Sequence, residues 1–436
     1  MRIMMLTWEF PPRVVGGLAR HVSELSIALA RLGHEVHVVT IQDPQCPPQE
    51  NYYGVRVWRA TPRGPRHDGL VQDALQMNLN LLETAVSVMG KVGPCDLFHA
   101  HDWLVAHSGV ALKHAYQRPL VVTIHATEWG RNGGLHNDLQ RQISDVEWWL
   151  CYEAWTVICC SQYMYGELQG IFQVPSDKLH VIPNGVNGVL PFLPPEELAA
   201  FRARYAADHE QVVFFMGRLV REKGVHILLD ALAQVVRLYP NTKLIVSGEG
   251  PERDFLQNKV SELGLQERVC FTGFINDELR NRFLGIADVA VFPSTYEPFG
   301  IVALEAMAAR VPVIVSNVGG FDEIIQHGIN GLKFYSGDAN SLVDNLLTLF
   351  GTPNLRSRLI QRARQDVLEK YNWQTIAQRT ATVYQQVLER YRQSPWAHQE
   401  PATRDWASMV GRWLSPRLPS RYQETTDTKP MPVPQH

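Results

Sequence analysis

Hydrophobic residues along the chain follow two alternating patterns. Short runs rich in Val, Ile and Leu, of the length of a buried strand, alternate with longer amphipathic stretches of helical length. The first series of runs comprises residues 3–7, 35–40, 97–100, 120–124 and 156–160. Helices are predicted between them at 18–32, 70–89 and 138–154. This alternation predicts a parallel, doubly wound sheet with helices on both faces.

A second series of apolar runs follows, again separated by helical stretches. It comprises residues 212–216, 243–247, 268–272, 288–292 and 311–316. Turn formers and prolines cluster before it, at 183–195. We therefore expect two Rossmann-like domains, 1–187 and 188–372, with a helix over 373–391 that returns to the first domain. Such sheets bind ligands at their carboxyl ends, so the domains should face one another across a cleft.

The last segment, 392–436, is rich in Pro, Gln, Ser and Thr, and we expect it to be largely disordered. One helical stripe of apolar residues interrupts it, formed by Trp406, Met409, Val410, Trp413 and Leu414. The stripe predicts an amphipathic helix over 403–414. We expect this helix to dock on the protein itself, and a partner or membrane surface is the alternative.

Composition narrows the class of protein. A chain of 436 residues exceeds a single compact core, and its net charge of −3 gives no electrostatic case for nucleic acid as a partner. No apolar stretch approaches the roughly 20 residues of a membrane span, and the N-terminus reads as a buried strand and not as a signal peptide. The six cysteines form no C-x-x-C unit, which indicates reduced thiols. We expect a cytoplasmic protein.

The segment 293–307 carries two acids, Glu297 and Glu305, with a proline and a glycine between them. Glu297 should lie in a loop after a strand, and Glu305 more than one turn into the next helix. The backbone amides at the start of that helix belong to Phe299, Gly300 and Ile301. Such amides suit an anion, whereas the two acids suit neutral hydroxyls such as those of a sugar. The alternative is a strand-to-helix turn with two ordinary surface acids.

Two further features lie where predicted strands end. Gly16 and Gly17 open the first helix, where paired glycines let backbone amides approach a phosphate or sugar. Arg218 and Lys223 follow the first strand of the second series and would place two cations at the carboxyl end of that sheet. Two such cations suit a diphosphate. The alternative for either cation is a solvated position in a turn.

Histidines follow two strands of the first series. His125 ends the fourth strand and should face the cleft, although a single histidine is more often structural. His99, His101 and Asp102 end the strand before it. No complete tetrahedral ligand set is evident, so we expect no metal site, and Asp102 would orient other groups in the cleft. The glycine-rich segment that begins at Glu128 is either an acceptor-binding loop or an ordinary mobile connection.

Taken together and in this order, these motifs resemble the GT-B retaining glycosyltransferases, in the branch that includes bacterial and archaeal glycogen synthases. The matching segments are Val-Gly-Gly-Leu at 15–18, Gly-His-Glu-Val at 33–36, His-Ala-His-Asp-Trp at 99–103, Pro-Asn-Gly-Val at 183–186, the stretch 217–224, and the two glutamates of 297–305. The resemblance covers about residues 1–391. It departs at Val14, where glycogen synthases often have lysine, and at Arg310, where glycine is usual.

The resemblance assigns roles on the donor side. Arg218 and Lys223 would bind the donor diphosphate and stabilise its charge as it departs. Glu305 would accept hydrogen bonds from the ribose, and Glu297 would hold hydroxyls of the transferred sugar and favour its cationic transition state. The amides of Phe299, Gly300 and Ile301 would add contacts to phosphate and sugar.

The resemblance also assigns roles in the first domain. Gly17 would approach the donor phosphate, and His125 would face the transferred sugar near its anomeric carbon. Asp102, Glu128 and Asn184 would lie on the acceptor side or support the groups that do. Members of this family retain the anomeric configuration, with front-face attack as the usual proposal. No metal or other cofactor is expected, because the two cations replace a divalent ion.

The leading hypothesis is therefore a retaining hexosyltransferase. It would move a sugar, with glucose expected, from a nucleotide-diphosphate sugar to a hydroxyl of an α-glucan, as a glycogen synthase does. A transferase that acts on another glycan, a lipid or a small molecule is the first alternative. A nucleotide-sugar epimerase and a non-catalytic sugar-binding protein are the others.

Overall fold

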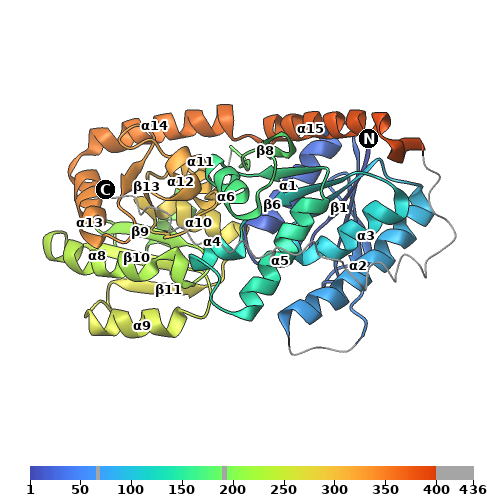
Figure 1. The fold of residues 1–436 in the computed structure, drawn as a ribbon. Coiled ribbons are helices and arrows are strands. Elements are labelled where there is room, and N and C mark those ends of the chain that lie inside the picture. Colours follow the sequence, from blue (N-terminus) through green and yellow to red (C-terminus); the bar gives the residue numbers. More distant parts are fainter. Residues whose placement is uncertain (65–68, 189–193, 399–436) are drawn as a thin grey trace.

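The computed structural model describes residues 1–64, 69–188 and 194–398 of the protein (Figure 1). The predicted helix over 403–414 and the rest of the tail to residue 436 lie outside the described residues. Two parallel sheets, each covered by helices, make up the two α/β domains. The predicted fold class is confirmed.

In the described part of the chain, the first sheet has eight strands in the order β3-β4-β2-β1-β5-β6-β7-β8. The strands are β1 (Arg2–Leu6), β2 (Glu35–Ile41), β3 (Gln49–Tyr52), β4 (Val55–Ala60), β5 (Leu97–His101), β6 (Leu120–Ile124), β7 (Thr156–Cys159) and β8 (Leu179–Val181). All neighbours are parallel except β3, which runs antiparallel to β4. Residues Ile3 to Leu6 of the central strand are fully buried, because helices cover both faces.

Six parallel strands form the second sheet of the described residues, in the order β11-β10-β9-β12-β13-β14. The strands are β9 (Gln211–Met216), β10 (Thr242–Ser247), β11 (Val269–Gly273), β12 (Val289–Phe292), β13 (Val313–Ser316) and β14 (Leu332–Phe334). The order reverses between β9 and β12, the position at which open parallel sheets bind ligands.

Amphipathic helices connect the strands. Those of the first domain are α1 (Gly17–Arg31), α2 (Leu70–Val92), α3 (Ala106–Tyr116), α4 (Glu128–Asn132), α5 (Asp138–Glu153) and α6 (Gln162–Phe172). Those that follow are α7 (Pro195–Arg202), α8 (Val225–Leu238), α9 (Arg253–Glu262), α10 (Asp277–Ile286), α11 (Ile301–Ala308), α12 (Gly319–Ile324), α13 (Ala339–Gly351) and α14 (Pro353–Lys370). Within the described ranges, no helix combines the length and apolarity that a membrane crossing requires.

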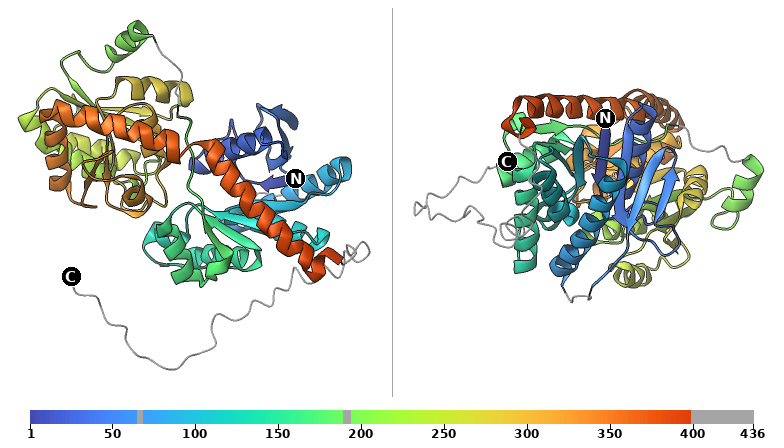
Figure 2. Two further views of the ribbon diagram at one scale, coloured as in Figure 1. Left: turned by 90° about the horizontal axis from the view of Figure 1, so that it is seen from above. Right: turned by 90° about the vertical axis from the view of Figure 1, so that its right-hand side faces the viewer.

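The last long helix, α15 (Trp373–Gln393), returns to the first domain and packs against α1. Figure 1 and the left view of Figure 2 show α14 over the second domain and α15 over the first. The two crossings of the chain between the domains lie side by side, since the backbone N–H of Val186 donates to the carbonyl of Tyr371 at 2.7 Å. The buried Tyr384 fixes α15 to the first sheet by a hydrogen bond to His99.

Local structure departs from the predicted elements in a few places. Strands β3, β4, β8 and β14 were not among the predicted runs: β8 and β14 have three residues each, and β4 carries two arginines in its six residues.

Arg310 follows the end of α11 with φ of 61°. This is the left-handed conformation that commonly ends a helix, and glycine adopts it without strain.

Candidate active site

The two cations of the second domain are positioned by a tight turn after β9. A short 3-10 helix (Arg221–Lys223) ends at Gly224, which has φ of 68°. A side chain there would place its Cβ 1.9 Å from the carbonyl oxygen of Pro293. Only glycine therefore lets this turn pack against the loop after β12. This packing brings Lys223 to Glu297, and Nζ of the lysine donates to Oε2 of the glutamate at 2.7 Å.

Glu297 is thus held after the end of β12 by Lys223 and Ser294. It is 7% exposed, and Ser294 Oγ donates to the same Oε2 at 3.1 Å. Arg218 lies close enough for its charge to interact with that of Glu297, and its guanidinium contacts Glu222 at 3.5 Å. Burial, together with the nearby charge of Arg131, lowers the pKa of Arg218. The predicted cations and Glu297 therefore form one cluster.

Glu305 lies on α11 and is buried, 6% exposed. Its Oε1 accepts from Nη1 of Arg20 at 2.8 Å and from Nη1 of Arg280 at 2.9 Å. Burial raises the pKa of Glu305, and the charge of Arg20 opposes this shift. Because Arg20 belongs to α1 of the first domain, this ion pair joins the two domains. A ribose at this carboxylate would share it with both arginines or displace one of them.

The starts of α1 and α11 meet across the domain boundary. A Cβ on Gly17 would lie 3.2 Å from Cδ1 of Ile301. Gly300, with φ of 103°, lets α11 begin directly against the ring of Phe321. Phe299 is buried beside it. Two helix N-termini that face one another both present positive partial charge, so an anion between them is stabilised by both.

A buried carboxyl group lies beneath the start of α1. Glu9 is 2% exposed, and its Oε2 accepts from the backbone N–H of Val15 at 2.6 Å and of Gly16 at 3.3 Å. Burial raises the pKa of Glu9 to about 7, although these hydrogen bonds oppose the shift. The group shapes the loop that leads into Gly17. Glu9 was not predicted from sequence, because a glutamate after a strand carries no local signal of burial.

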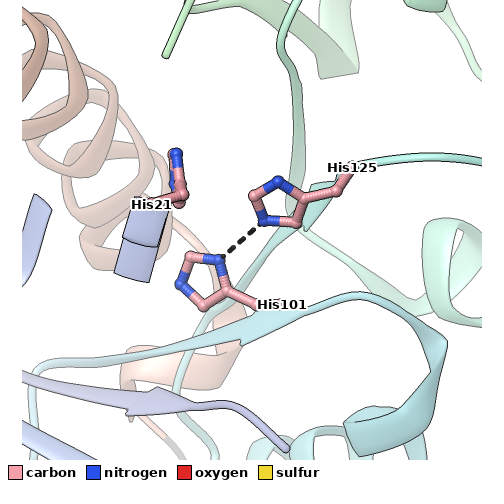
Figure 3. Close-up of side chains that lie close together, drawn as sticks. All are labelled: His21, His101 and His125. Atoms are coloured by element: carbon pink, nitrogen blue, oxygen red, sulfur yellow. Dashed lines mark hydrogen bonds between the residues drawn. The ribbon is translucent and has the colours of Figure 1, made fainter. Parts of the chain in front are cut away.

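Histidines from three elements of the first domain converge near the boundary (Figure 3). His101 Nδ1 and His125 Nε2 are 3.3 Å apart. His21, on α1, lies edge-on to His125 with ring centroids 4.6 Å apart, and its Nδ1 is 2.6 Å from Oδ1 of Asn184. Burial lowers the pKa of His125 to about 3, so its imidazole is neutral at physiological pH. His21 was not selected from sequence.

His99, in contrast, is a structural residue. Its Nδ1 lies 2.6 Å from the hydroxyl of Tyr384 and its Nε2 lies 2.8 Å from Oγ1 of Thr123, so both ring nitrogens are satisfied. Asp102 has φ of 63° and turns back to accept the backbone N–H of His125 at 2.7 Å. Burial raises the pKa of Asp102 to about 6. Asp102 thereby orients the segment that carries His125.

The segment that begins at Glu128 forms the short helix α4. The Glu128 side chain accepts from Asn132 of the same helix at 3.0 Å, and among the described residues no hydrogen bond joins it to the other predicted site residues. Its neighbour Gly130 packs so closely on Tyr296 that a Cβ would lie 2.5 Å from the tyrosine ring. The helix is therefore part of the contact between the domains.

The loop that carries Glu297 is attached to the first domain at the residues on either side. The Tyr296 hydroxyl donates to Oε1 of Glu167 at 3.1 Å, and the Ser161 hydroxyl donates to the carbonyl of Pro298 at 2.6 Å. The carboxylate of Glu323 accepts the backbone N–H groups that begin α6. The contacts thus bring Gly17 to the start of α11 and Arg20 to Glu305, and they group both cations with Glu297. Asp102 and Asn184 contact the histidines, at His125 and His21.

Comparisons with known proteins agree with this arrangement. Residues 15–188 match the family described as Glycosyltransferase Family 4, and residues 199–366 match Glycosyl transferases group 1. The chain is 40% identical over 398 residues to an uncharacterised glycosyltransferase of Methanocaldococcus jannaschii, a match that covers 89% of this chain and 99% of the relative. It is 36% identical over 399 residues to a glycogen synthase of Mycobacterium tuberculosis, which covers 88% of this chain and 94% of the relative.

Among solved structures, sucrose-phosphate synthase of Thermosynechococcus elongatus has the same fold with a TM-score of 0.78 and 26% identity. The match covers 89% of this chain and 99% of that one. The two family matches agree with the two-sheet architecture and with the relatives that match over nearly their whole length. The chain belongs to the GT-B glycosyltransferases, in the branch that includes the glycogen synthases.

Proposed function

We propose that the protein is a retaining hexosyltransferase that moves a sugar, with glucose expected, from a nucleotide-diphosphate sugar to a hydroxyl of an α-glucan. One observation carries the proposal: the largely buried pair of Lys223 and Glu297, 2.7 Å apart, lies beside Arg218 at the ligand-binding edge of the second sheet. Cations for a diphosphate and a carboxylate for sugar hydroxyls are therefore neighbours. The relationship to glycogen synthase supports glucose and glucan as the substrates.

The reaction follows from the charges. The bond between the anomeric carbon and the donor diphosphate breaks, and negative charge develops on the departing oxygen near Arg218 and Lys223. The facing starts of α1 and α11 stabilise the same charge. The acceptor oxygen bonds to the anomeric carbon on the same face, and its proton passes to the departing phosphate oxygen. Glu297 stabilises the cationic sugar, and neutral His125 offers it a hydrogen bond.

Two further features belong to the proposal. We infer that the chemistry needs no metal ion, because the two cations would replace a divalent ion in neutralising the diphosphate. We also infer a cytoplasmic location, since all six cysteines are unpaired and four of them are buried. The adjacent Cys159 and Cys160 are among the buried ones, and burial raises the pKa of both thiols.

A second candidate is a transferase with a phosphorylated sugar as acceptor. Arg131, on α4, is half-buried and forms no ion pair with any residue that the structure describes. Its charge acts on Arg218, His125 and Asp102, so it lies near residues that we assign to both donor and acceptor. A phosphate on the acceptor would be its natural partner. The structural similarity to sucrose-phosphate synthase supports this alternative.

A donor and acceptor screen separates the candidates. ADP-, UDP- and GDP-glucose are each incubated with a glucan primer, with glucose 1-phosphate and with no acceptor, and product configuration is read by NMR. An α-linked extension of the primer that is lost in Glu297→Gln supports the proposal. Extension of the phosphorylated sugar alone supports the second candidate. Donor binding without transfer or hydrolysis indicates a non-catalytic protein, and an isomerised donor sugar indicates an epimerase.

A further inference from the structure

Three imidazoles from separate elements of the first domain form a compact cluster. His21 lies on α1, His101 ends β5, and His125 follows β6 (Figure 3). Each offers one ring nitrogen, and the three nitrogens lie within 4.8 Å of one another. His21 and His101 are buried at 3% and 0% exposure, whereas His125 is partly exposed. Of the three histidines, His125 is the one that solvent reaches.

The hydrogen bond of His21 determines which of its nitrogens is free. The Asn184 Oδ1 atom, 2.6 Å from His21 Nδ1, is a carbonyl oxygen and can only accept. Nδ1 therefore carries the proton, and the lone pair of the neutral ring is on Nε2. Among the described residues, this buried Nε2 has no hydrogen-bond partner. Histidines that bind metals have this arrangement, with the second N–H held by a carbonyl or carboxylate.

The spacing of the other two histidines fits an ion. His101 Nδ1 and His125 Nε2 face one another at 3.3 Å. In a tetrahedral zinc site with Zn–N bonds of 2.0–2.1 Å, two ligand nitrogens are about 3.3 to 3.4 Å apart. An ion can therefore bind to this pair with little movement of either ring. The His21 nitrogen lies within 4.8 Å of the other two, so it must approach by at most about 1.5 Å to complete the set.

The neighbouring groups define the composition of the site. His99 is excluded as a fourth ligand, because both of its nitrogens are already bonded. Asp102, which accepts the backbone N–H of His125, supplies a carboxyl group close to the added positive charge. Three imidazole ligands are preferred by Zn²⁺, Cu²⁺ and Ni²⁺ over Mg²⁺ or Ca²⁺. The three histidines leave a fourth position for water or another ligand.

We propose that His21, His101 and His125 bind one divalent transition-metal ion, with Zn²⁺ as the reference ion. Apart from His125, the site takes no part in the sugar-transfer chemistry proposed above. Its occupancy has a consequence that does rest on that proposal: the ion adds positive charge at His125, the residue proposed to face the cationic sugar, and so disfavours the transition state. Bound Zn²⁺ should therefore inhibit transfer, and removal of the ion should restore it.

Binding is tested on the full chain, purified without a histidine tag and dialysed against EDTA. Titration with ZnCl₂ by calorimetry should give one ion per chain, and Co²⁺ should show the visible absorption of a tetrahedral site. His21→Asn should weaken Zn²⁺ binding at least tenfold, and so should Asn184→Ala, since loss of a residue that orients a ligand typically costs about 10- to 100-fold in affinity. The matched control is His136→Asn, an exposed histidine of the same domain whose loss should leave binding unchanged.

Several outcomes decide the proposal. Each variant must first show the circular dichroism and thermal melt of a folded protein without metal, and Asn184→Ala serves if His21→Asn does not fold. Absence of stoichiometric binding in the unmodified chain overturns the site, and so does binding that both variants leave intact. Zinc binding without inhibition of transfer supports the site and removes His125 from the proposed mechanism. The two proposals can therefore fail separately.

Discussion

Replacing Lys223 with methionine tests the pair on which the proposed function rests. Methionine keeps most of the length and the apolar stem of lysine and removes the charged donor. In the unmodified protein the ammonium is 2.7 Å from the Glu297 carboxylate, and the two side chains are 20% and 9% exposed. The substitution therefore leaves the largely buried Glu297 carboxylate without its cation.

The expected loss of stability follows from this burial. At an effective dielectric constant of about 20, two unit charges at this separation attract one another by roughly 6 kcal/mol, much of which offsets their desolvation. Removal of one partner of a buried pair costs about 3–5 kcal/mol. Ser294 still donates to Glu297 in the variant, so we expect the lower end, about 3 kcal/mol. That loss lowers the melting temperature of the second domain by roughly 6 to 12 °C.

The assay is a double-mutant cycle with a matched control. Unfolding and transfer are measured for the unmodified chain, Lys223→Met, Glu297→Gln and the double variant. The double variant should regain most of the stability lost in Lys223→Met, because no charge remains unpaired. Each of the three variants should slow transfer by about 10²- to 10³-fold, as loss of a transition-state charge contact does. Arg221→Met, on the same short helix but with a side chain 66% exposed, should change neither property.

Two results would contradict the reasoning. If the stability losses of the two single variants simply add up in the double variant, the Lys223–Glu297 pair contributes nothing to the stability of the fold, although the two groups are close together. If the double variant regains transfer together with stability, the loss in Lys223→Met reflected the unpaired carboxylate alone. The lysine would then have no part in stabilising the leaving group.

Three further predictions concern other parts of the site and its supports. Because burial raises the pKa of Glu9 from 4.5 to about 7, the folded protein disfavours the ionised form, and stability is lost as pH rises through this interval. The Glu9→Gln variant should therefore gain stability relative to the unmodified chain between pH 5 and pH 8, by at most about 3 kcal/mol; an equal difference in melting temperature at both pH values refutes this. Gly130→Ala should clash with Tyr296, open the domain contact and raise the radius of gyration in X-ray scattering, whereas Gly166→Ala, with no atom within 4 Å, should not. Arg310→Gly should raise the free energy of unfolding by roughly 1 kcal/mol, because φ of 61° strains arginine; denaturant titration that shows a loss would contradict this.

Much of the fold could be predicted from local pattern. The strands of a parallel sheet are buried on both faces, so each leaves a continuous apolar run, and the central strands of both sheets lie where those runs are. The positions of Glu297, Arg218 and His125 followed in turn, because residues directly after such strands share one edge of the sheet. Strands as short as β8 and β14 contain too few residues for any pattern to be read.

The partners of the site residues were decided only by the tertiary structure. Arg20 contacts Glu305 across 285 positions of sequence, and His21 contacts Asn184 across 163. Burial of Glu9 and the approach of three histidines likewise depend on how the helices and the two sheets pack. Periodicity indicates which face of a helix or strand is apolar. It does not indicate which distant side chain packs against that face. The sequence by itself therefore determined the elements and the edge where the chemistry lies, and the packing of the two domains decided which charges meet there.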